Sequence, residues 1–426
     1  MRWLVSGLAP DVGRRSDPTP LMTSAATVPL TSAFADFGVS APVVEVLARR
    51  NITDTFPIQE LVLPDALAGR DVLARSRTGS GKTLAFAVPI VERLSPSGKP
   101  SALVLVPTRE LAAQVAEEFR AIAGAKHLRV AAVYGGVGIT AQVDRARRAD
   151  ILIATPGRLL DLLRRRLVRI NRVRTCVLDE ADRMLDMGFI PDVRLILSLL
   201  SDDRQTMLFS ATLDGEIGRL AGEFTRDPVL HEIHDDRPVI AEANHRFVAV
   251  EAKDKLDTLV RELGAERGLT LVFVRTKRGA ARLARNLNTL GFGAEALHGD
   301  MSQAARERSL ARFASGKADV LAATDVAARG LDVEHISHVV NFDPPADDKA
   351  YVHRVGRTAR AGRGGTGVTF VTPDQQAEMG KMADILKLHG EFADAGLSRV
   401  RVVRPSVEGR PRLGQQPSTR RRRRRY

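Results

Sequence analysis

A glycine-rich run, Ser76-Arg-Thr-Gly-Ser-Gly-Lys-Thr83, has the residue types that bind phosphate groups. Its glycines let backbone N–H groups surround phosphate oxygens without Cβ clashes. The run also opens a predicted helix, whose N-terminus favours negative charge. We expect Lys82 to reach the terminal phosphates of a nucleotide and the Thr83 hydroxyl to bind Mg²⁺. The residues of this run that we assign to nucleotide binding are Ser76, Arg77, Thr78, Gly79, Ser80, Gly81, Lys82 and Thr83.

The strict form of this phosphate-binding pattern begins with Gly, whereas the chain has Ser76 at that position. A glycine-rich turn between a strand and a helix can also be purely structural. The Gly-Lys-Thr ending in that context argues against the structural alternative.

Two acids, Asp179-Glu180, follow another predicted strand and have the chemistry that nucleotide hydrolysis needs. We expect Asp179 to hold Mg²⁺ and Glu180 to orient or deprotonate the attacking water. An Asp-Glu pair at a strand end is often only a solvated turn, so this prediction depends on the phosphate-binding run upstream. Cys176, in the same strand, is expected to be a small buried core residue.

Short apolar runs alternate with longer helical patterns in the region that contains both groups. Runs bounded by turns and separated by helices predict a parallel sheet with helices on both faces. The predicted strands of this first half are 71–74, 102–106, 130–134, 151–154, 175–178 and 206–209, with helices at 84–94 and 110–123.

A second series of the same kind follows a stretch with two prolines and several charges near 227–243. Its predicted strands are 247–250, 271–274, 294–297, 320–323, 338–341 and 367–371, and its predicted helices are 253–263, 277–290, 302–313 and 375–389. We expect a disordered extension at 1–30, an α/β domain at 31–228, a linker at 229–243, a second α/β domain at 244–396 and a basic disordered tail at 397–426. Ligand sites commonly lie between two such domains.

The formal net charge of +13 lies mostly at the C-terminal end, where residues 399–426 hold eleven Arg and one acid. The folded part is therefore only weakly basic. One cysteine excludes an internal disulfide framework and indicates a reducing compartment. Because no apolar run approaches the roughly 20 residues that span a bilayer, and the N-terminus lacks a full secretion signal, we expect a cytoplasmic protein. Either Met1 or Met22 could be the start.

The tetrapeptide Asp179-Glu180-Ala181-Asp182 lies within Val-Leu-Asp-Glu-Ala-Asp-Arg-Met-Leu-Asp-Met-Gly-Phe189. On these residues, and on further motifs in the same order, the sequence resembles the DEAD-box family of ATP-dependent RNA helicases, and within it the bacterial RhlE-type subgroup. The resemblance runs from about Phe34 to about Phe370. It implies two tandem RecA-like domains, ATP and Mg²⁺ as cofactors, and RNA as the partner.

On the nucleotide side, the resemblance implies that Gln59, in Pro57-Ile-Gln59, contacts adenine and that Phe34 stacks on the base. The chain departs from the family at Thr55-Phe56, where Pro-Thr is usual.

The motif Ser210-Ala-Thr212 is implied to couple hydrolysis to strand separation by bonding Asp182. Without the resemblance, it would be an ordinary turn at a strand end.

The second domain is implied to complete the site through His353-Arg-Val-Gly-Arg-Thr-Ala-Arg360. Arg357 and Arg360 would stabilise charge on the transferring phosphoryl group, and His353 would link this motif to the DEAD tetrapeptide. The resemblance also places Asp332 near the ribose and Gly330 near the phosphates. Without it, the run 353–360 could be only a basic helix face.

The RNA-binding positions lie mainly at predicted strand ends, which form one surface at the edge of a parallel sheet. Hydroxyls, guanidinium groups and backbone N–H groups there suit phosphate contacts, although each alone could be a helix cap or a turn. In the first domain these residues are Thr108, Arg109, Gly135, Gly136, Thr155, Gly157 and Arg158, and in the second Arg275, Thr276, Gln303, Arg306 and Thr324. The arginine-rich tail either adds affinity for RNA by counterion release or is a solvated charge run.

The expected function is an RNA-stimulated ATPase that contacts the RNA backbone and locally unwinds short duplexes. Two alternatives stay open: a DNA-translocating helicase on the same fold, and an ATP-gated RNA clamp or scaffold. The set Lys82, Glu180 and Arg357 argues against the clamp, because a clamp does not need hydrolytic residues.

Overall fold

The computed structural model describes residues 34–76, 80–233, 243–264, 268–328, 333, 335–358 and 364–397. The expected N-terminal extension at 1–30 lies outside these residues, as do residues 398–426 of the expected basic tail. Within the described part, no helix is long and apolar enough to cross a membrane.

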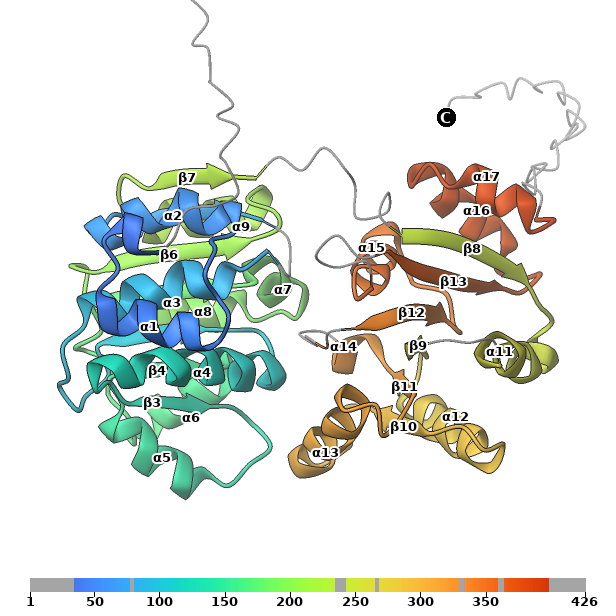
Figure 1. The fold of residues 1–426 in the computed structure, drawn as a ribbon, viewed down its shortest axis with the longest axis horizontal. Coiled ribbons are helices and arrows are strands. Elements are labelled where there is room, and N and C mark those ends of the chain that lie inside the picture. Colours follow the sequence, from blue (N-terminus) through green and yellow to red (C-terminus); the bar gives the residue numbers. More distant parts are fainter. Residues whose placement is uncertain are drawn as a thin grey trace, which may run out of the picture.

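The first domain is built on a seven-stranded sheet in the order β3-β4-β2-β5-β6-β1-β7, and its neighbouring strands all pair in parallel (Figure 1). The strands are β1 (Val72–Arg75), β2 (Ala102–Leu105), β3 (Val130–Val133), β4 (Ile151–Ala154), β5 (Thr175–Asp179), β6 (Gln205–Ser210) and β7 (Val229–Glu232). The helices around them are η1 (Phe34–Phe37), α1 (Ala41–Arg49), α2 (Pro57–Ala68), α3 (Lys82–Arg93), α4 (Arg109–Ala123), η2 (Gly124–Lys126), α5 (Ile139–Arg148), α6 (Pro156–Arg164), α7 (Ala181–Asp186), α8 (Ile190–Ser198) and α9 (Gly215–Phe224).

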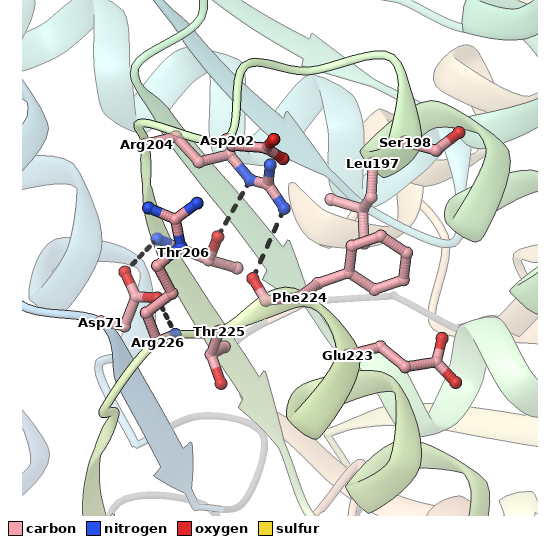
Figure 2. Close-up of a pocket in the computed structure, with 10 residues that line it drawn as sticks. All are labelled: Asp71, Leu197, Ser198, Asp202, Arg204, Thr206, Glu223, Phe224, Thr225 and Arg226. Atoms are coloured by element: carbon pink, nitrogen blue, oxygen red, sulfur yellow. Dashed lines mark hydrogen bonds between the residues drawn. The ribbon is translucent and has the colours of Figure 1, made fainter.

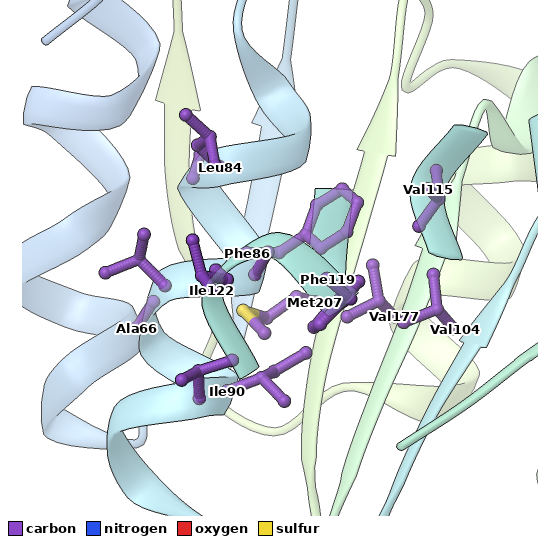
Figure 3. Close-up of a cluster of buried hydrophobic side chains, with 14 of the residues drawn as sticks. Ala66, Leu84, Phe86, Ile90, Val104, Val115, Phe119, Ile122, Val177 and Met207 are labelled. Atoms are coloured by element: carbon purple, nitrogen blue, oxygen red, sulfur yellow. The ribbon is translucent and has the colours of Figure 1, made fainter. Parts of the chain in front are cut away.

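The central strands β2, β4, β5 and β6 are buried along their whole length, so their sequences are largely apolar rather than alternating. Successive side chains still point to opposite faces. Val104 therefore joins one core cluster with Phe86 and Phe119, while Leu103 joins the other. Figure 3 shows the first of these clusters, in which α3 and α4 pack their apolar faces onto the sheet. Because helices pack on both faces of the sheet, the strand ends and the residues that follow them are held in fixed positions.

The second domain contains a six-stranded parallel sheet in the order β10-β11-β9-β12-β13-β8. Its strands are β8 (Ala243–Ala249), β9 (Leu269–Phe273), β10 (Ala294–Leu297), β11 (Val320–Ala323), β12 (Ile336–Asn341) and β13 (Gly365–Val371). Its helices are η3 (Ala252–Asp254), α11 (Lys255–Leu263), α12 (Lys277–Thr289), α13 (Gln303–Ala314), α14 (Asp325–Ala328), α15 (Asp348–Val355), α16 (Gln376–Ile385) and α17 (His389–Asp394). The prediction of two α/β domains, each with a parallel sheet and flanking helices, is confirmed.

Two predicted elements need correction. Residues 229–232, which we placed in the linker, form β7 and pair with β1 at the edge of the first sheet. An edge strand is half solvated, and this one contains the polar residues His231 and Glu232. A prediction based on apolar runs therefore misses it. The single closing helix predicted at 375–389 is in fact α16 and α17, because Lys387 adopts a left-handed conformation with φ 60° between them.

Candidate nucleotide and RNA site

The phosphate-binding run lies between β1 and α3, as its sequence predicts. Gly81 adopts a φ of 84° at the N-cap of α3, a conformation that glycine reaches without a Cβ penalty. Lys82 is 7% exposed, and its Nζ donates to the Ser76 carbonyl oxygen at 3.1 Å. Ser80 Oγ donates to Ser76 Oγ at 3.1 Å. The lysine ammonium is therefore held against its own loop, where incoming phosphate oxygens can replace the carbonyl partner.

Three residues of this run, Arg77, Thr78 and Gly79, lie outside the described residues. Thr83 occupies the first turn of α3, half-buried, beside Lys82.

Gln59 connects the start of α2 to the phosphate-binding run. Its Oε1 accepts a hydrogen bond from the Phe56 backbone N–H at 2.9 Å, and its Nε2 donates to the Gly81 carbonyl oxygen at 2.9 Å. The side chain is only 1% exposed. One amide N–H and one oxygen lone pair are not used by these two bonds, so the amide keeps the donor and acceptor that reading a base edge requires.

Phe34 does not fit the stacking role that we expected of it. It lies in η1, is 2% exposed and belongs to the core beneath α1 and α2. A ring packed on all sides by core residues has almost no face left for a nucleotide base.

Asp179 and Glu180 lie at the carboxyl end of β5, where it passes into α7. Asp179 is 3% exposed, and its Oδ1 is buried without a hydrogen-bond partner among the described residues. Burial raises the pKa of Asp179 to about 6, against the opposing attraction of Lys82. A buried carboxylate oxygen without a partner is costly, and a divalent cation would satisfy it. Asp179 and Thr83, beside the phosphate-binding lysine, therefore fit Mg²⁺.

Arg183 contacts Glu180 and was missed by the sequence analysis. Its Nη1 donates to Glu180 Oε2 at 2.9 Å, and both side chains are almost fully buried. Glu180 itself adopts a left-handed φ of 53°, which is uncommon for a residue with a side chain. The spacing of three residues along α7 could have indicated this ion pair.

The motif at the end of β6 is connected to the DEAD tetrapeptide. Ser210 Oγ accepts hydrogen bonds from the backbone N–H of Asp182 at 3.2 Å and of Thr212 at 3.3 Å. The bond to Asp182 runs through its backbone. A shift of β6 relative to α7 would therefore change this hydrogen bond and act on both segments.

Residues of the second domain face this region of the first. A cavity of about 30 Å³ is lined by Arg183 together with Phe273, Asp325, Ala328, Ala350, His353, Arg354 and Arg357. Burial lowers the pKa of His353, and the Arg183 charge lowers it further, whereas Asp182 opposes the change. Arg357 is 5% exposed and its Nε donates to the His353 carbonyl oxygen at 3.3 Å. The structure thus brings His353 and Arg357 to the face that carries Arg183 and Glu180.

Three other predicted site residues of the second domain, Gly330, Asp332 and Arg360, lie outside the described residues. Arg354, which was not predicted, forms two bonds of 2.6 and 2.7 Å to the Asp325 carboxylate and also bonds Asn341. It is a buried structural arginine that positions α15.

The RNA-binding candidates of the first domain lie at strand ends, and two of their guanidinium groups contact the loop after β3. A Cβ on Gly136 would overlap Arg109 Nη1, so only glycine lets this guanidinium pack on the Gly135–Gly136 turn. Arg158 Nη1 donates to Gln142 Oε1 at 3.0 Å and to the Val137 carbonyl oxygen at 3.3 Å. The three motifs thus form one connected surface.

The simpler role of a helix cap is present at Thr108, whose Oγ1 accepts from Leu111 N at 3.2 Å at the start of α4. Thr155 occupies the N-cap position of α6, where Gly157 lies in the first turn, but its side chain makes no capping hydrogen bond.

In the second domain, the candidates lie just before α12, on α13 and just after β11. Thr276 Oγ1 caps α12, and the Arg275 backbone N–H donates to Asp343. Gln303 and Thr324 are 3% and 7% exposed, so each presents little surface in this arrangement.

Arg306, which we expected to contact RNA, instead forms a contact between the domains. Its Nη2 lies 2.6 Å from Glu110 Oε1, and both side chains are buried. Nη1 also donates to the His298 carbonyl oxygen at 3.1 Å. Because this guanidinium is buried and paired, it does not offer its charge to an RNA phosphate in this structure.

A larger cavity of about 330 Å³ lies at the opposite end of the first sheet (Figure 2). Asp71, just before β1, accepts there from the backbone N–H groups of Thr206 and Arg226, both at 2.7 Å. The predicted site residues follow the carboxyl ends of strands, whereas this cavity lies where β1 and β6 begin. Size alone would therefore select the wrong end of the domain.

Two RecA-like domains, a glycine-rich phosphate loop before α3 and buried acids after β5 define a two-domain P-loop nucleoside triphosphatase. Comparison with known families narrows this class. The DEAD/DEAH box helicase family matches residues 56–220, and the helicase conserved C-terminal domain matches residues 254–362.

Individual relatives agree with these family matches. The chain is 43% identical over 351 residues to the DEAD-box ATP-dependent RNA helicase CshA of Bacillus subtilis, covering 82% of this chain and 71% of that protein. It is also 43% identical over 349 residues to CshA of Geobacillus kaustophilus, covering 81% and 75%. The solved structure of S. cerevisiae Dbp5 bound to RNA and ADP BeF3 is 30% identical, with a TM-score of 0.73, over 84% of this chain and 94% of that chain.

The chain belongs to the DEAD-box family of ATP-dependent RNA helicases. The fold and the family predicted from the sequence are confirmed, and an RNA-stimulated ATPase is the activity that membership implies.

Proposed function

We propose that this protein hydrolyses ATP at a site shared by its two domains and uses the cycle to separate short RNA duplexes locally. The observation that carries the proposal is the small cavity where Arg357 and His353 of the second domain meet Arg183, the partner of Glu180. Arg183, which pairs with the Glu180 carboxylate, and the second-domain residues His353 and Arg357 thus line one cavity.

In this proposal, Gln59 reads the adenine edge, and the backbone N–H groups before α3 hold the phosphates together with Lys82. Thr83 and Asp179 would hold Mg²⁺, which neutralises phosphate charge when bound. The buried, unpartnered oxygen of Asp179 supports this assignment.

Hydrolysis is assigned to Glu180, which orients the attacking water and accepts its proton. Arg357 and Arg360 stabilise the charge that develops on the transferring phosphoryl group. Arg183 donates a hydrogen bond to the Glu180 carboxylate in this structure. Full activity therefore requires at least one oxygen of that carboxylate to face the attacking water. Domain closure, which brings the second-domain arginines to the phosphates, is the step that we expect to complete this arrangement.

RNA is proposed to bind along the connected strand-end surface that contains Arg109, Gly136 and Arg158. Guanidinium and backbone groups there suit phosphates rather than bases, so weak sequence preference follows. Preference for RNA over DNA would come from 2′-hydroxyl contacts and strand shape. RNA and ATP both favour the closed arrangement, so each should raise the affinity for the other by the same factor.

The glutamate variant Glu180→Gln tests this proposal. We expect turnover to fall by about 10²–10⁴-fold, while an ATP-dependent RNA complex accumulates and can be measured by fluorescence anisotropy. Glu216→Gln, at an exposed glutamate on α9, is the matched control. Wild-type turnover in Glu180→Gln would remove the water-activating role. An RNA clamp without hydrolysis predicts no ATPase in the parent protein.

The remaining alternative is a DNA-translocating helicase. It is tested by comparing how strongly RNA and DNA of equal sequence stimulate the ATPase activity. Stronger stimulation by DNA would support a DNA-translocating helicase instead.

Three finer assignments belong to the same proposal. On its sequence motifs we place the chain in the bacterial RhlE-type subgroup, although the two relatives at 43% identity are named CshA. The first domain is assigned to residues 31–228 together with β7, and the second domain to residues 244–396. A cytoplasmic location is supported by the single cysteine, Cys176, which is buried and free.

A further inference from the structure

Phe56 is a large apolar side chain that the fold leaves half exposed, at 48%. It occupies the N-cap of α2, where Ser, Thr, Asp and Asn are preferred because their side chains accept a backbone hydrogen bond. A phenyl ring cannot do so, and its exposure shows that it is not packed into the core. Local structure therefore gives no reason for an aromatic residue here.

The ring lies against the phosphate-binding run. A Cβ built on Gly81 would lie 2.8 Å from Phe56 Cδ2 and 2.6 Å from Gln59 Nε2. The ring edge and the Gln59 amide therefore approach the same point above Gly81. Gln59 fixes this arrangement, because it accepts from the Phe56 backbone N–H and donates to the Gly81 carbonyl oxygen.

The chemistry of the neighbouring groups indicates which part of a nucleotide would meet this ring. Phosphates are attracted to the α3 N-terminus and to Lys82, and an uncharged ring adds nothing to that attraction. The Gln59 amide suits the polar edge of a base. A flat apolar ring beside that amide suits the face of the base, and Phe34 is too buried, at 2% exposure, to provide one.

We propose that Phe56 provides the aromatic contact to the nucleotide base, an inference that rests on the proposed ATP site. The contact strengthens binding without selecting the base, because every base has a π face. Base selection is left to the Gln59 amide. The two neighbouring residues thus divide affinity and specificity between them.

Equilibrium binding of ATP, GTP and tripolyphosphate to the full chain tests this inference. Phe56→Ala is expected to weaken ATP and GTP alike, by about 5- to 150-fold, as the loss of one base–aromatic stack does. Tripolyphosphate, which has no base, should bind the variant as it binds the parent protein. Gln59→Ala should instead reduce the preference for ATP over GTP.

Two further variants separate ring contact from helix stability. Phe56→Thr restores a capping side chain, so we expect a thermal midpoint at or above that of Phe56→Ala together with the same loss of ATP affinity. Phe56→Trp should retain the affinity. Leu290→Ala removes a similarly exposed apolar side chain (53%) at the end of α12 in the second domain and is the matched control.

Parent-like ATP affinity in Phe56→Ala, or an equal loss of tripolyphosphate binding, would overturn the inference. Failure of the proposed function looks different: the parent protein itself would then bind no ATP, or would bind it equally well after Lys82→Ala. If the parent protein binds ATP through Lys82 but substitution of Phe56 has no effect, only the role of Phe56 is refuted, and the proposed function stands.

Discussion

The two halves of the nucleotide site differ in how their side chains are held. In the first domain, the Lys82 and Gln59 side chains bond the phosphate-binding run, and Ser210 at the end of β6 bonds the Asp182 backbone N–H. In the second, the guanidinium of Arg357, which follows α15, bonds the carbonyl oxygen of His353 on that helix. We propose that the first half is assembled for a nucleotide in advance and that closure of the domains brings the second half to it. A site divided in this way makes hydrolysis depend on the approach of the domains.

The largest expected effect comes from the second half of the site. Arg357→Ala should reduce kcat by about 10³–10⁵-fold, because an arginine at the transferring phosphoryl group acts mainly in the transition state. ATP binding, which depends on the first half, should change far less. Steady-state kinetics with saturating RNA measure both quantities. Arg226→Ala, an exposed arginine at the remote end of the first sheet, is the control. A loss confined to KM would contradict the division between the halves.

The next largest effect is expected from the buried ion pair between Arg306 and Glu110, which joins the two domains. Glu110→Gln leaves the buried Arg306 charge without its partner, a loss that costs about 3–5 kcal/mol in buried pairs. Since the pair spans the domains, we expect RNA-stimulated ATPase to fall at least tenfold while ATP binding by the first domain persists. Glu117→Gln breaks an exposed pair with Arg120 on the same helix and should have little effect. Equal behaviour of the two variants would exclude the interdomain role.

A smaller effect is expected from a change in pH, which acts on Asp179 in the first half of the site. Burial raises the pKa of Asp179 to about 6, and a cation binds only the deprotonated carboxylate. Affinity for Mg²⁺ with ATP should therefore fall as pH drops below 6, by about tenfold between pH 7 and pH 5. Asp179→Asn should bind weakly at both values. A parent protein without this pH dependence would argue against Asp179 as the metal ligand.

The same raised pKa has a consequence for stability. Burial disfavours the ionised carboxylate in the folded protein without a cation, so this cost is present above about pH 6 and is relieved as Asp179 protonates at lower pH.

The sequence predicts the central strands well because each is a short apolar run between turns. It fails at β7, where half-solvated residues break the pattern, and at Lys387, where a single left-handed residue divides a helix. Both are decided by tertiary context rather than by local periodicity.

The candidate site shows a similar limit. Motif residues predict which groups gather at the strand ends, but not which partner each finds. Arg306 pairs with Glu110, and Arg183 pairs with Glu180, through contacts that span domains or a helix turn. Burial of Phe34 and exposure of Phe56 depend on packing around α2. Such pairings follow from three-dimensional packing, which a list of motifs does not contain.

The most direct test of the divided site is a structure of the protein with a non-hydrolysable ATP analogue, Mg²⁺ and single-stranded RNA. We predict that Arg357 leaves the His353 carbonyl oxygen and contacts the γ-phosphate, which Lys82 and the Asp179-bound cation hold from the other side. A closed, ligand-bound structure in which the Arg357 guanidinium still bonds His353 and points away from the triphosphate would contradict the account.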